Sequence, residues 1–569
     1  MRENMHVLLV YPEFPQTFWS FDRALELVGR KVLMPPLGLI TVAALLPAHW
    51  KLRLVDENIR PVSKADWHWA DLVIISAMLV QKKGLARLIA RARQSRLPVA
   101  VGGPFATSTP EAPELALANF LILDEGEITI PRWIEAIENG AKNGRFSAEG
   151  EKPDISLSPI PRFDLLERRA YDMMAVQFSR GCPFQCEFCD IIVLYGRKPR
   201  TKSADQLLAE LDALRALHWR GSIFLVDDNF IGNKRNVQLL LPKLKEWQRQ
   251  HGFPFLFTTE ASVDLASDPD LIDQMVDCGF QRVFLGIETP DTDSLRGAGK
   301  LQNTRSPLEE AVETITSHGL QVMAGFILGF DGEQPEAGRR IVEFVTRTGI
   351  PLAMVGVLQA LPNTALWHRL RNENRLLESD GRFDEGVQTH LFNFLPSRPI
   401  DQIGAEFVEA FHQLYEPRAY LERAYLTCRS LAAADQRRGN ERGRGRLQLP
   451  DPGLLRGLLI LLWRQGIRRE SRWLFWRQLG AMAWRHPSRL VDYFWLLMLE
   501  EHFLSYRDVV AQQVEAQLAS RSRRQPQQAS LSGAPLKRKA LALPPWQPAP
   551  RKRSNRIEGA PTSPSPRKT

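Results

Sequence analysis

The chain has 569 residues, of which 44% are hydrophobic, 9% aromatic and 24% charged, with a net charge of +9. This composition is that of a globular protein, so collagen-like, wholly disordered and polytopic membrane chains are excluded. The positive charge is not spread evenly, because residues 521–569 hold twelve Lys or Arg and one Glu, which leaves residues 1–520 slightly acidic. We therefore do not expect nucleic acid as a partner of the folded part.

The amino terminus and the apolar segments indicate neither export nor a membrane span. The stretch MRENMHVLLVYPEF has a short apolar core and no small-residue cleavage site, so it predicts a strand rather than a signal peptide. The longest apolar runs, 454–463 and 493–499, fall short of the roughly 18 residues that cross a bilayer. We expect a cytoplasmic protein, with a peripheral membrane location as the alternative.

Residues 1–140 alternate apolar strands with amphipathic helices. The expected strands are HVLLVYP, LRLVDEN, DLVIISAM, PVAVGGPF and FLILDEGE. Uninterrupted apolar strands separated by helices indicate a doubly wound, Rossmann-like parallel sheet, whose ligand binds over the carboxyl ends of the strands. Residues 141–165 are rich in Gly, Pro and Ser without periodicity and predict a linker.

A second series of strands and helices occupies residues 166–380. Six expected strands, from AVQFSRGC to LAMVGVLQ, alternate with helices and show no antiparallel return. This pattern predicts a partial (β/α)6 barrel of the TIM type, with active residues at the carboxyl ends of its strands.

Beyond the barrel, residues 381–520 are expected to form a helical domain and residues 521–569 a disordered basic tail. The helices between 454 and 504 are crowded with Trp, Leu, Phe and Arg. Three interpretations stay open for them: the core of a helical bundle, a cap over an apolar substrate, or a surface at a membrane interface.

Three of the five cysteines lie within eight residues. Cys182, Cys186 and Cys189 form a C-x3-C-x2-C motif directly after a predicted strand, a spacing typical of metal ligands rather than disulfides. Three thiolates hold three corners of a 4Fe-4S cluster and leave the fourth iron open. A structural zinc site would need a fourth ligand, and the nearest histidine, His218, lies far along a predicted helix.

With Phe188 before its last cysteine, this motif resembles the signature of the radical S-adenosylmethionine superfamily. The resemblance covers about residues 166–375 and implies that the three cysteines ligate the cluster, while Phe188 lies against the adenine of S-adenosylmethionine. Further cofactor contacts that the resemblance implies follow the expected strands: Asp227, Asp228, Asn229, Glu260, Glu288, Gly325, Ile327 and Gly329. The chain departs from many relatives in carrying Val226-Asp227-Asp228 instead of Gly-Gly-Glu.

The N-terminal domain resembles the Rossmann-like cobalamin-binding domains that precede radical S-adenosylmethionine barrels. The positions that carry the likeness are Asp56, Asn58, Ser76, Gly102 and Gly103. Where many cobalamin proteins have Asp-x-His-x-x-Gly, this chain has DENIR, so no histidine is expected below the cobalt, and His68 is not expected to replace it. The resemblance implies cobalamin with its lower base detached, and the glycines leave room for its bulky tail beside the backbone.

A cobalamin domain joined to such a barrel resembles the class B radical methyltransferases, and the whole chain is similar to the hopanoid C-2 methylase group. In that class a 5′-deoxyadenosyl radical takes hydrogen from an unactivated carbon, which then receives a methyl group from methylcobalamin. The resemblance implies an enzyme that methylates an apolar, isoprenoid- or tetrapyrrole-like small molecule, with flavodoxin or ferredoxin as electron donor.

Other functions stay open from the sequence. A radical cyclase or oxidase similar to the tetrapyrrole ring cyclases has the same architecture without methyl transfer. An RNA methylthiotransferase is disfavoured, because that family carries extra N-terminal cysteines and residues 1–181 contain none. A protein tethered to RNA or membrane by its basic tail is the alternative from a different class.

Overall fold

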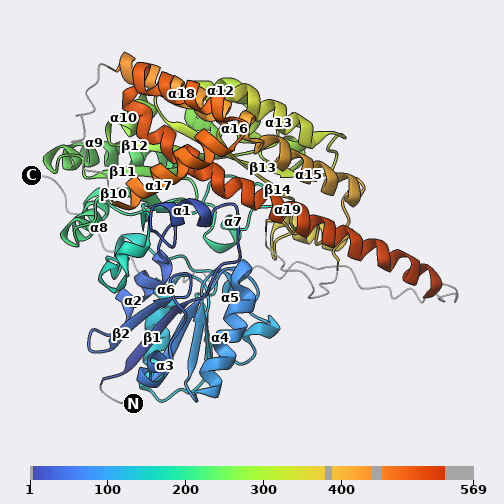
Figure 1. Ribbon diagram of the computed structural model, residues 1–569. Helices are drawn as coiled ribbons and strands as arrows, with labels where there is room; N and C mark the ends of the chain where they lie inside the picture. Colours follow the sequence, from blue (N-terminus) through green and yellow to red (C-terminus); the bar gives the residue numbers. More distant parts are fainter. Residues whose placement is uncertain (1–3, 378–387, 439–451, 532–569) are drawn as a thin grey trace, which may run out of the picture. The chain divides into compact units, whose positions relative to one another are not determined.

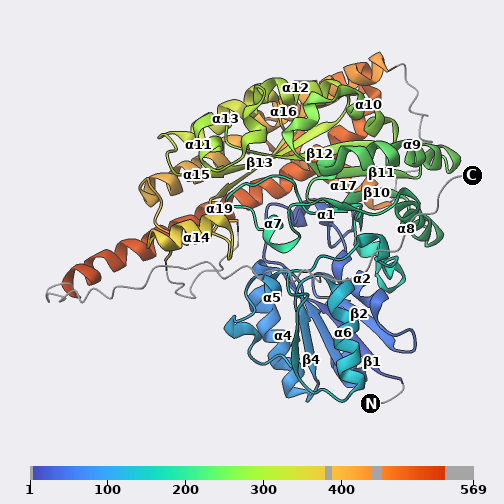
Figure 2. The ribbon, with the colours of Figure 1, turned by 180° about the vertical axis from the view of Figure 1, so that it is seen from behind.

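The computed structural model of the chain describes residues 4–377, 388–438 and 452–531. Contacts within the chain define one unit from Met1 to Ala519, which holds everything discussed below, and a second from Ser520 to Thr569. In the described part of the first unit, two six-stranded parallel sheets are followed by a run of helices (Figures 1 and 2). The predicted α/β architecture with a helical C-terminal region is confirmed.

The first sheet has the strand order β2-β1-β3-β4-β5-β6, with every neighbouring pair parallel. Its strands are β1 (His6–Tyr11), β2 (Lys51–Asp56), β3 (Leu72–Ser76), β4 (Val99–Gly102), β5 (Phe120–Ile122) and β6 (Gly144–Phe146). The order reverses direction at β1, which places a crevice above the carboxyl ends of β1 and β3. Strand β6 lies in the segment 141–165 that the sequence predicts as a linker, so part of that segment completes the sheet.

Helices cover both faces of the first sheet: α2 (Leu37–Leu45), α3 (Lys64–Trp69), α4 (Lys82–Gln94), α5 (Pro104–Ser108) and α6 (Gly126–Glu138). Side chains alternate along each strand, so Leu8 and Val10 of β1 enter the core shared with α3, α4 and α5. Val7 and Leu9 enter the other core, which includes α2 and α6 and continues into the second sheet. Burial on both faces explains the uninterrupted apolar strands.

The second sheet has the order β14-β13-β12-β11-β10-β7 and is again parallel throughout. Its strands are β7 (Met174–Val176), β10 (Gly221–Leu225), β11 (Phe255–Ala261), β12 (Phe280–Glu288), β13 (Gln321–Leu328) and β14 (Leu352–Val357). The helices of this part are α7 (Ile191–Leu194), α8 (Ala204–Ala216), α9 (Lys234–Gln250), α10 (Pro269–Asp277), α11 (Thr292–Gly297), α12 (Leu308–Ser317) and α13 (Ala337–Thr348). Among the described residues β7 and β14 are not paired to each other, as expected for a partial barrel.

The C-terminal helices are α14 (Ala365–Asn372), α15 (Ile400–Leu414), α16 (Pro417–Arg437), α17 (Pro452–Trp463), α18 (Arg472–Arg485) and α19 (Leu490–Leu531). A single π-helical turn, η9 (Arg464–Arg468), joins α17 to α18. Helix α19 continues past Arg521, where the sequence predicts that a disordered tail begins, and the rest of that tail lies outside the described residues.

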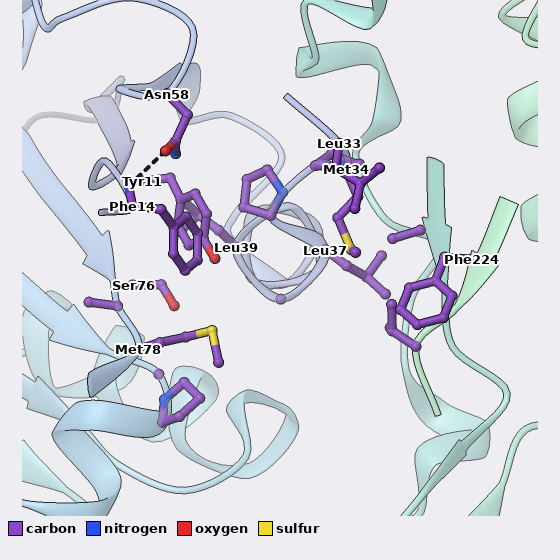
Figure 3. A pocket seen from close by; sticks show the side chains of 18 of the residues that line it. Tyr11, Phe14, Leu33, Met34, Leu37, Leu39, Asn58, Ser76, Met78 and Phe224 are labelled. Atoms are coloured by element: carbon purple, nitrogen blue, oxygen red, sulfur yellow. Dashed lines mark hydrogen bonds between the residues drawn. The ribbon is translucent and has the colours of Figure 1, made fainter. Parts of the chain in front are cut away.

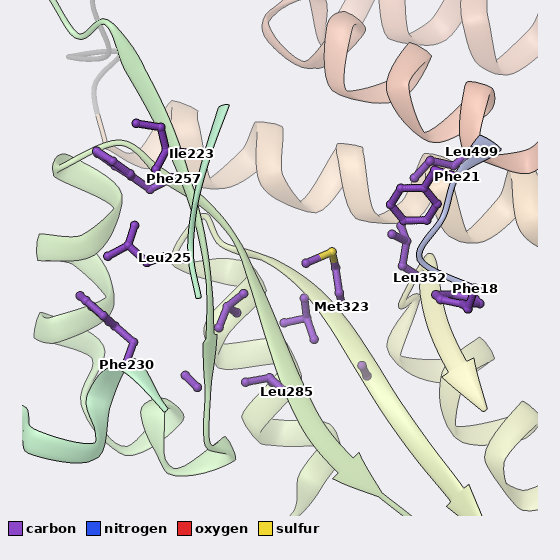
Figure 4. Close-up of a cluster of buried hydrophobic side chains, with 14 of the residues drawn as sticks. Phe18, Phe21, Ile223, Leu225, Phe230, Phe257, Leu285, Met323, Leu352 and Leu499 are labelled. Carbon is purple, nitrogen blue, oxygen red and sulfur yellow. The ribbon is translucent and has the colours of Figure 1, made fainter. Parts of the chain in front are cut away.

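The segment before α1 (Asp22–Leu27) connects the three parts of the first unit. Phe18 stacks on Phe503 of α19 with ring centroids 4.7 Å apart, and it also contacts Tyr415. Phe18 and Phe21 lie beside Leu352 of β14 and Leu499 of α19 (Figure 4). Because these side chains are buried in one continuous core, the N-terminal segment packs against both the barrel and the last helix.

Candidate functional site

The cysteine loop follows β7 and is held at its base by two carboxylates from the end of β10. Asp227 accepts hydrogen bonds from the Phe178 and Ser179 amides at 2.8 and 2.9 Å. Asp228 accepts one from the Gly181 amide at 2.7 Å, next to the first cysteine. Both oxygens of Asp227 are thereby used within the chain, so the aspartates fix the start of the loop.

These two carboxylates have shifted pKa values. Burial raises the pKa of Asp227 to about 7 and that of Asp228 to about 6, even though their hydrogen bonds to the loop backbone act in the opposite direction. A raised pKa means that the folded protein disfavours the charged form of these groups.

Two amide side chains donate toward the cysteine sulfurs. Asn229 Nδ2 lies 3.9 Å from Cys182 Sγ, and Gln302 Nε2, in the 3-10 turn η8 (Leu301–Thr304), lies 3.5 Å from Cys186 Sγ. Such N–H···S contacts favour thiolates that ligate iron. Asn229 is a predicted site residue, whereas the sequence analysis missed Gln302, which reaches the loop from 116 residues away.

The donor set fits a 4Fe-4S cluster. Burial raises the pKa of Cys182, and raises that of Cys189 to about 12, so without iron these thiols keep their protons. Among the described residues no three His, Cys, Asp or Glu side chains converge on a single metal ion. A cluster does not require such convergence, because each of its three ligated irons takes one cysteine.

A buried ion pair lies behind the cysteine loop. Lys300 pairs with Glu288, the last residue of β12, and its Nζ lies 5.8 Å from the centroid of the Phe188 ring. Burial alone would lower the pKa of Lys300, but the Glu288 carboxylate raises it above the usual value. The predicted residue Glu288 therefore has a cationic partner in the chain, which sequence reasoning did not find.

The predicted adenine-contacting strand is β13 with the turn after it. A Cβ on Gly325 would lie 2.9 Å from the Phe284 ring, and one on Gly329 would lie 2.4 Å from the ring of Phe392. Aromatic rings of the chain itself therefore account for both glycines. Ile327, between them, is half-buried on the same strand.

A cavity of about 1010 Å³ opens between the carboxyl ends of the two sheets. Predicted site residues from both domains line it: Asn58, Ser76, Gly102, Gly103, Asp228 and Glu260. Figure 3 shows Asn58, Ser76 and Met78 of the first domain on one side of the cavity and Phe224 of β10 on the other. Leu37 lies between the two sides. Trp495 of α19 also lines the cavity, 4.1 Å from the guanidinium of Arg282.

The wall of the first domain forms a cradle without side chains. Gly103 has a φ of +91°, and a Cβ there would lie 2.6 Å from Ser76 Oγ. A Cβ on Gly102 would lie 3.0 Å from the Ile122 carbonyl oxygen. Close contacts within the chain therefore require glycine at both positions, and the bare backbone that results lines the cavity. Backbone without side chains suits the close approach of a bulky ligand, so the cradle fits the predicted cobalamin.

Asp56 and Asn58, at the end of β2 and just after it, have different roles. The Asp56 carboxylate is buried and accepts hydrogen bonds from Tyr171 Oη at 3.0 Å and from Asn58, and it does not line the cavity. Asn58 lines the cavity and accepts from the Phe14 amide at 2.7 Å (Figure 3). Asp56 thus holds Asn58 in place. His68 is exposed on α3, and among the described residues that line the cavity none is a histidine.

An ion-pair network that the sequence analysis did not find joins the first domain to the cysteine loop. Arg180, two residues before Cys182, contacts Glu125 at 2.9 Å and Glu127 at 2.8 Å. Arg200 of β9 (Arg200–Thr201) holds the second oxygen of Glu125 at 2.8 Å. The side chains of Arg180 and both glutamates are at most 12% exposed, so this clamp is shielded from solvent.

Glu260 stands at the end of β11 and faces the cavity. Burial, together with the nearby Asp228 and Asp227, raises its pKa to about 8. A carboxyl group with such a pKa keeps its proton near neutral pH, so it can donate a hydrogen bond to a polar group in the cavity.

A doubly wound sheet and a partial barrel share one cavity, with a glycine cradle at the first and a three-cysteine loop at the second. Together they define a radical S-adenosylmethionine protein with a cobalamin-binding domain. Family models agree with this class. Residues 27–133 match the B12 binding domain, residues 176–345 match the radical SAM superfamily, and residues 364–516 match a domain of unknown function (DUF4070).

Curated proteins and solved structures extend the match to most of the chain. It is 55% identical over 524 residues to an uncharacterized methyltransferase of Synechocystis sp., covering 92% of this chain and 96% of that one. It is 36% identical over 489 residues to the hopanoid C-2 methylase of Rhodopseudomonas palustris, covering 83% and 88%. The structure of OxsB, a cobalamin-dependent S-adenosylmethionine radical enzyme, shares the fold with a TM-score of 0.54 at 16% identity, covering 91% of this chain and 81% of OxsB.

The chain belongs to the family of B12-binding radical S-adenosylmethionine methyltransferases that includes hopanoid C-2 methylase. Its assignment as an enzyme is confirmed. So are its predicted cofactors at the level of the family, namely a 4Fe-4S cluster, S-adenosylmethionine and cobalamin. Among the described helices, none is long and apolar enough to cross a bilayer.

Proposed function

We propose that the protein methylates an unactivated carbon of an apolar polycyclic lipid of the hopanoid type. The observation that carries this proposal is the single cavity shared by the glycine cradle and the carboxyl ends of the barrel strands. The cysteines do not line the cavity, but Asp228 does, and it accepts from the Gly181 amide beside Cys182. A carbon held in the cavity would therefore lie beside the cobalamin cradle and near the cysteine loop. When bound, the cofactors supply the radical and methyl-transfer chemistry, and the chain supplies position and exclusion of water.

The walls between the two edges suit an apolar substrate. Leu33, Met34 and Leu37 come from the first domain and Phe284 and Met323 from the barrel, and together they offer no charge to a ligand. The relative at 36% identity is a hopanoid C-2 methylase, which supports a substrate of that class.

Most of the predicted site residues have a proposed role. Cys182, Cys186 and Cys189 hold the cluster, with Phe188 beside it. Asn58, Ser76, Gly102 and Gly103 hold cobalamin, and Glu260 binds a polar group of S-adenosylmethionine. Asp227 and Asp228 position the cysteine loop, in place of the direct cofactor contact that the motif implies, and Asp56 positions Asn58.

Two further contacts belong to this proposal. A one-electron donor such as flavodoxin or ferredoxin reduces the cluster, and the C-terminal helices bring the enzyme to the membrane in which an apolar lipid resides. Exposed tryptophans on these helices support the second point.

The test is turnover with a candidate lipid. The protein is reconstituted anaerobically with iron, sulfide and hydroxocobalamin and incubated with a reductant, methyl-labelled S-adenosylmethionine and a hopanoid. We expect 5′-deoxyadenosine and a lipid that carries the labelled methyl group. A lipid altered without gain of the label would contradict methyl transfer and indicate a cyclase or oxidase.

A further inference from the structure

Helices α17 and α18 carry a concentration of exposed aromatic and aliphatic side chains. Seven of the nineteen exposed large hydrophobic side chains among the described residues lie between Leu455 and Trp484. Those of α17 and η9 recur every four residues: Leu455, Leu459, Trp463 and Ile467. Those of α18 are Trp473, Trp476 and Trp484. Spacings of three, four and eight residues place each set along one face of its helix.

The two faces adjoin at the π-helical turn between the helices. Trp476 Nε1 donates to the Gly466 carbonyl oxygen at 2.8 Å, so the start of α18 packs on η9 beside Ile467. The opposite sides of the helices are buried, with Leu461 and Phe475 in the main core. The exposed faces are therefore not needed for folding of this region. We call residues 455–485 on these faces the Trp/Arg surface.

The charge of this surface is strongly positive. From Leu455 to Arg485 the sequence has seven arginines and one acidic residue, Glu470. Arg464 and Arg469 pair with Glu501 of α19, but among the described residues no carboxylate pairs with Arg468, Arg477 or Arg485. Exposed tryptophans with flanking arginines are the composition of helices that lie in the headgroup region of anionic bilayers.

The Trp/Arg surface is close to the cavity through α1. A Cβ on Gly457 of α17 would lie 2.9 Å from the Leu27 carbonyl oxygen at the end of α1. Phe21 and Asp22, at the start of α1, line the cavity. The body of α17 and the short helix α1 thus lie between the surface and a wall of the cavity.

We infer that the Trp/Arg surface docks the enzyme on anionic lipid bilayers, with the tryptophans at headgroup depth and the arginines on phosphates. This inference rests on the membrane contact in the proposed function and specifies its surface and lipid charge. Its test needs no turnover, so a failure of docking is distinguishable from a failure of methylation. Because the sequence adds twelve basic residues after 520, the electrostatic part of the binding is expected to include the tail.

The test uses the purified full chain and vesicles of phosphatidylcholine with or without phosphatidylglycerol. We expect sedimentation with the anionic vesicles and a blue shift of tryptophan emission. Trp473 and Trp484 are 74% and 88% exposed, so Trp473→Ser and Trp484→Ser leave the core intact. Each should lower the partition coefficient on the order of ten-fold.

Controls separate this surface from general hydrophobicity and charge. Leu117→Ser with Leu157→Ser, at exposed sites elsewhere, should bind as the wild type. Truncation after residue 531 should weaken binding at low salt and leave the blue shift. Wild type that stays in solution with anionic vesicles would overturn the inference, as would a Trp473/Trp484 double variant that binds normally. A dimer that the double variant converts to monomers would also overturn it and assign the surface to a second copy of the chain.

Discussion

The two strand edges that border the cavity both belong to parallel sheets but have opposite character. The edge of the first sheet presents Gly102, Gly103, Ser76 and the side-chain amide of Asn58. These groups carry no charge, so this edge offers a ligand its shape and hydrogen bonds. The edge of the second presents Asp228 and Glu260, both with raised pKa values, while the buried Asp227 beside them fixes the cysteine loop. Parallel strands place their carboxyl ends together in both sheets. The residue types at those ends therefore decide whether the edge is a cradle of bare backbone or an acidic site.

The largest effect is expected at the edge of the second sheet, from Cys186→Ala. Two cysteines cannot hold the cluster that three hold, so 5′-deoxyadenosine formation should fall below detection and the iron content of the reconstituted protein should drop. Cys278→Ala is the matched control, because Cys278 is equally buried but lies outside the loop. Wild-type amounts of 5′-deoxyadenosine from Cys186→Ala would refute the assignment of the loop.

At the cradle, Gly103→Ala should abolish most cobalamin binding. The new Cβ meets Ser76 Oγ at 2.6 Å, and the φ of +91° adds backbone strain of about 1–2 kcal/mol. We expect at least roughly ten-fold weaker binding, measured by corrinoid retained after gel filtration. Gly140→Ala, at φ +88° with nothing within 4 Å, has the strain without the crowding and should bind normally. Equal losses in both variants would show that strain alone matters.

The ion pair between Arg180 and Glu127, which joins the first domain to the cysteine loop, is tested by Glu127→Gln. The variant weakens the grip on Arg180, which precedes the cysteine loop, so the two cofactors are held less firmly relative to each other. We expect more 5′-deoxyadenosine per methyl group transferred, with an unchanged cluster spectrum. Glu111→Gln, which breaks the exposed pair with Arg145, is the control. If Glu127→Gln forms the same amount of 5′-deoxyadenosine per methyl group as the wild type, the ion pair contributes only to folding.

Glu260, at the edge of the second sheet, is expected to make the stability of the protein depend on pH. Its folded pKa of about 8 exceeds the unfolded value of 4.5, so the folded protein keeps a proton that the unfolded chain loses. The free energy of unfolding of the cofactor-free protein should therefore fall as pH rises from about 5 to about 8. Glu260→Gln should reduce that fall by roughly 3 kcal/mol, measured by urea denaturation at each pH. The same slope in both proteins would contradict the raised pKa.

The smallest effect is expected from Gln302→Leu. Loss of the N–H···S contact with Cys186 should lower the reduction potential of the cluster by some tens of millivolts, because such bonds stabilise the reduced form. An EPR-monitored redox titration measures the shift, with Gln334→Leu at an exposed site as the control. A potential equal to that of the wild type would remove Gln302 from the cluster environment.

The sequence predicts best those features that are local in the chain. The cysteine loop is recognisable because its three ligands lie within eight residues, and the strands because both faces of each sheet are buried. The cradle is predictable for a related reason, since Ser76, Gly102 and Gly103 end neighbouring strands.

Features that depend on distant partners could not be predicted. Tyr171 reaches Asp56 across 115 residues, which turns a predicted cofactor contact into a support for Asn58. Gln302, Lys300 and the Arg180 clamp also come from segments far apart in the chain. No local pattern marks Trp495 of α19 as a wall of the cavity, because its position depends on the packing of the whole helical region.

In the proposed function, the cavity between the two edges brings cobalamin close to the cluster held by the cysteine loop. Pulsed EPR of the reconstituted protein, with cob(II)alamin and the reduced cluster both paramagnetic, measures their separation through the magnetic coupling. We expect a resolved coupling in the wild type and a broader distribution of couplings in Glu127→Gln. Uncoupled signals in a protein that retains both cofactors would contradict the shared cavity and the methyl transfer proposed from it.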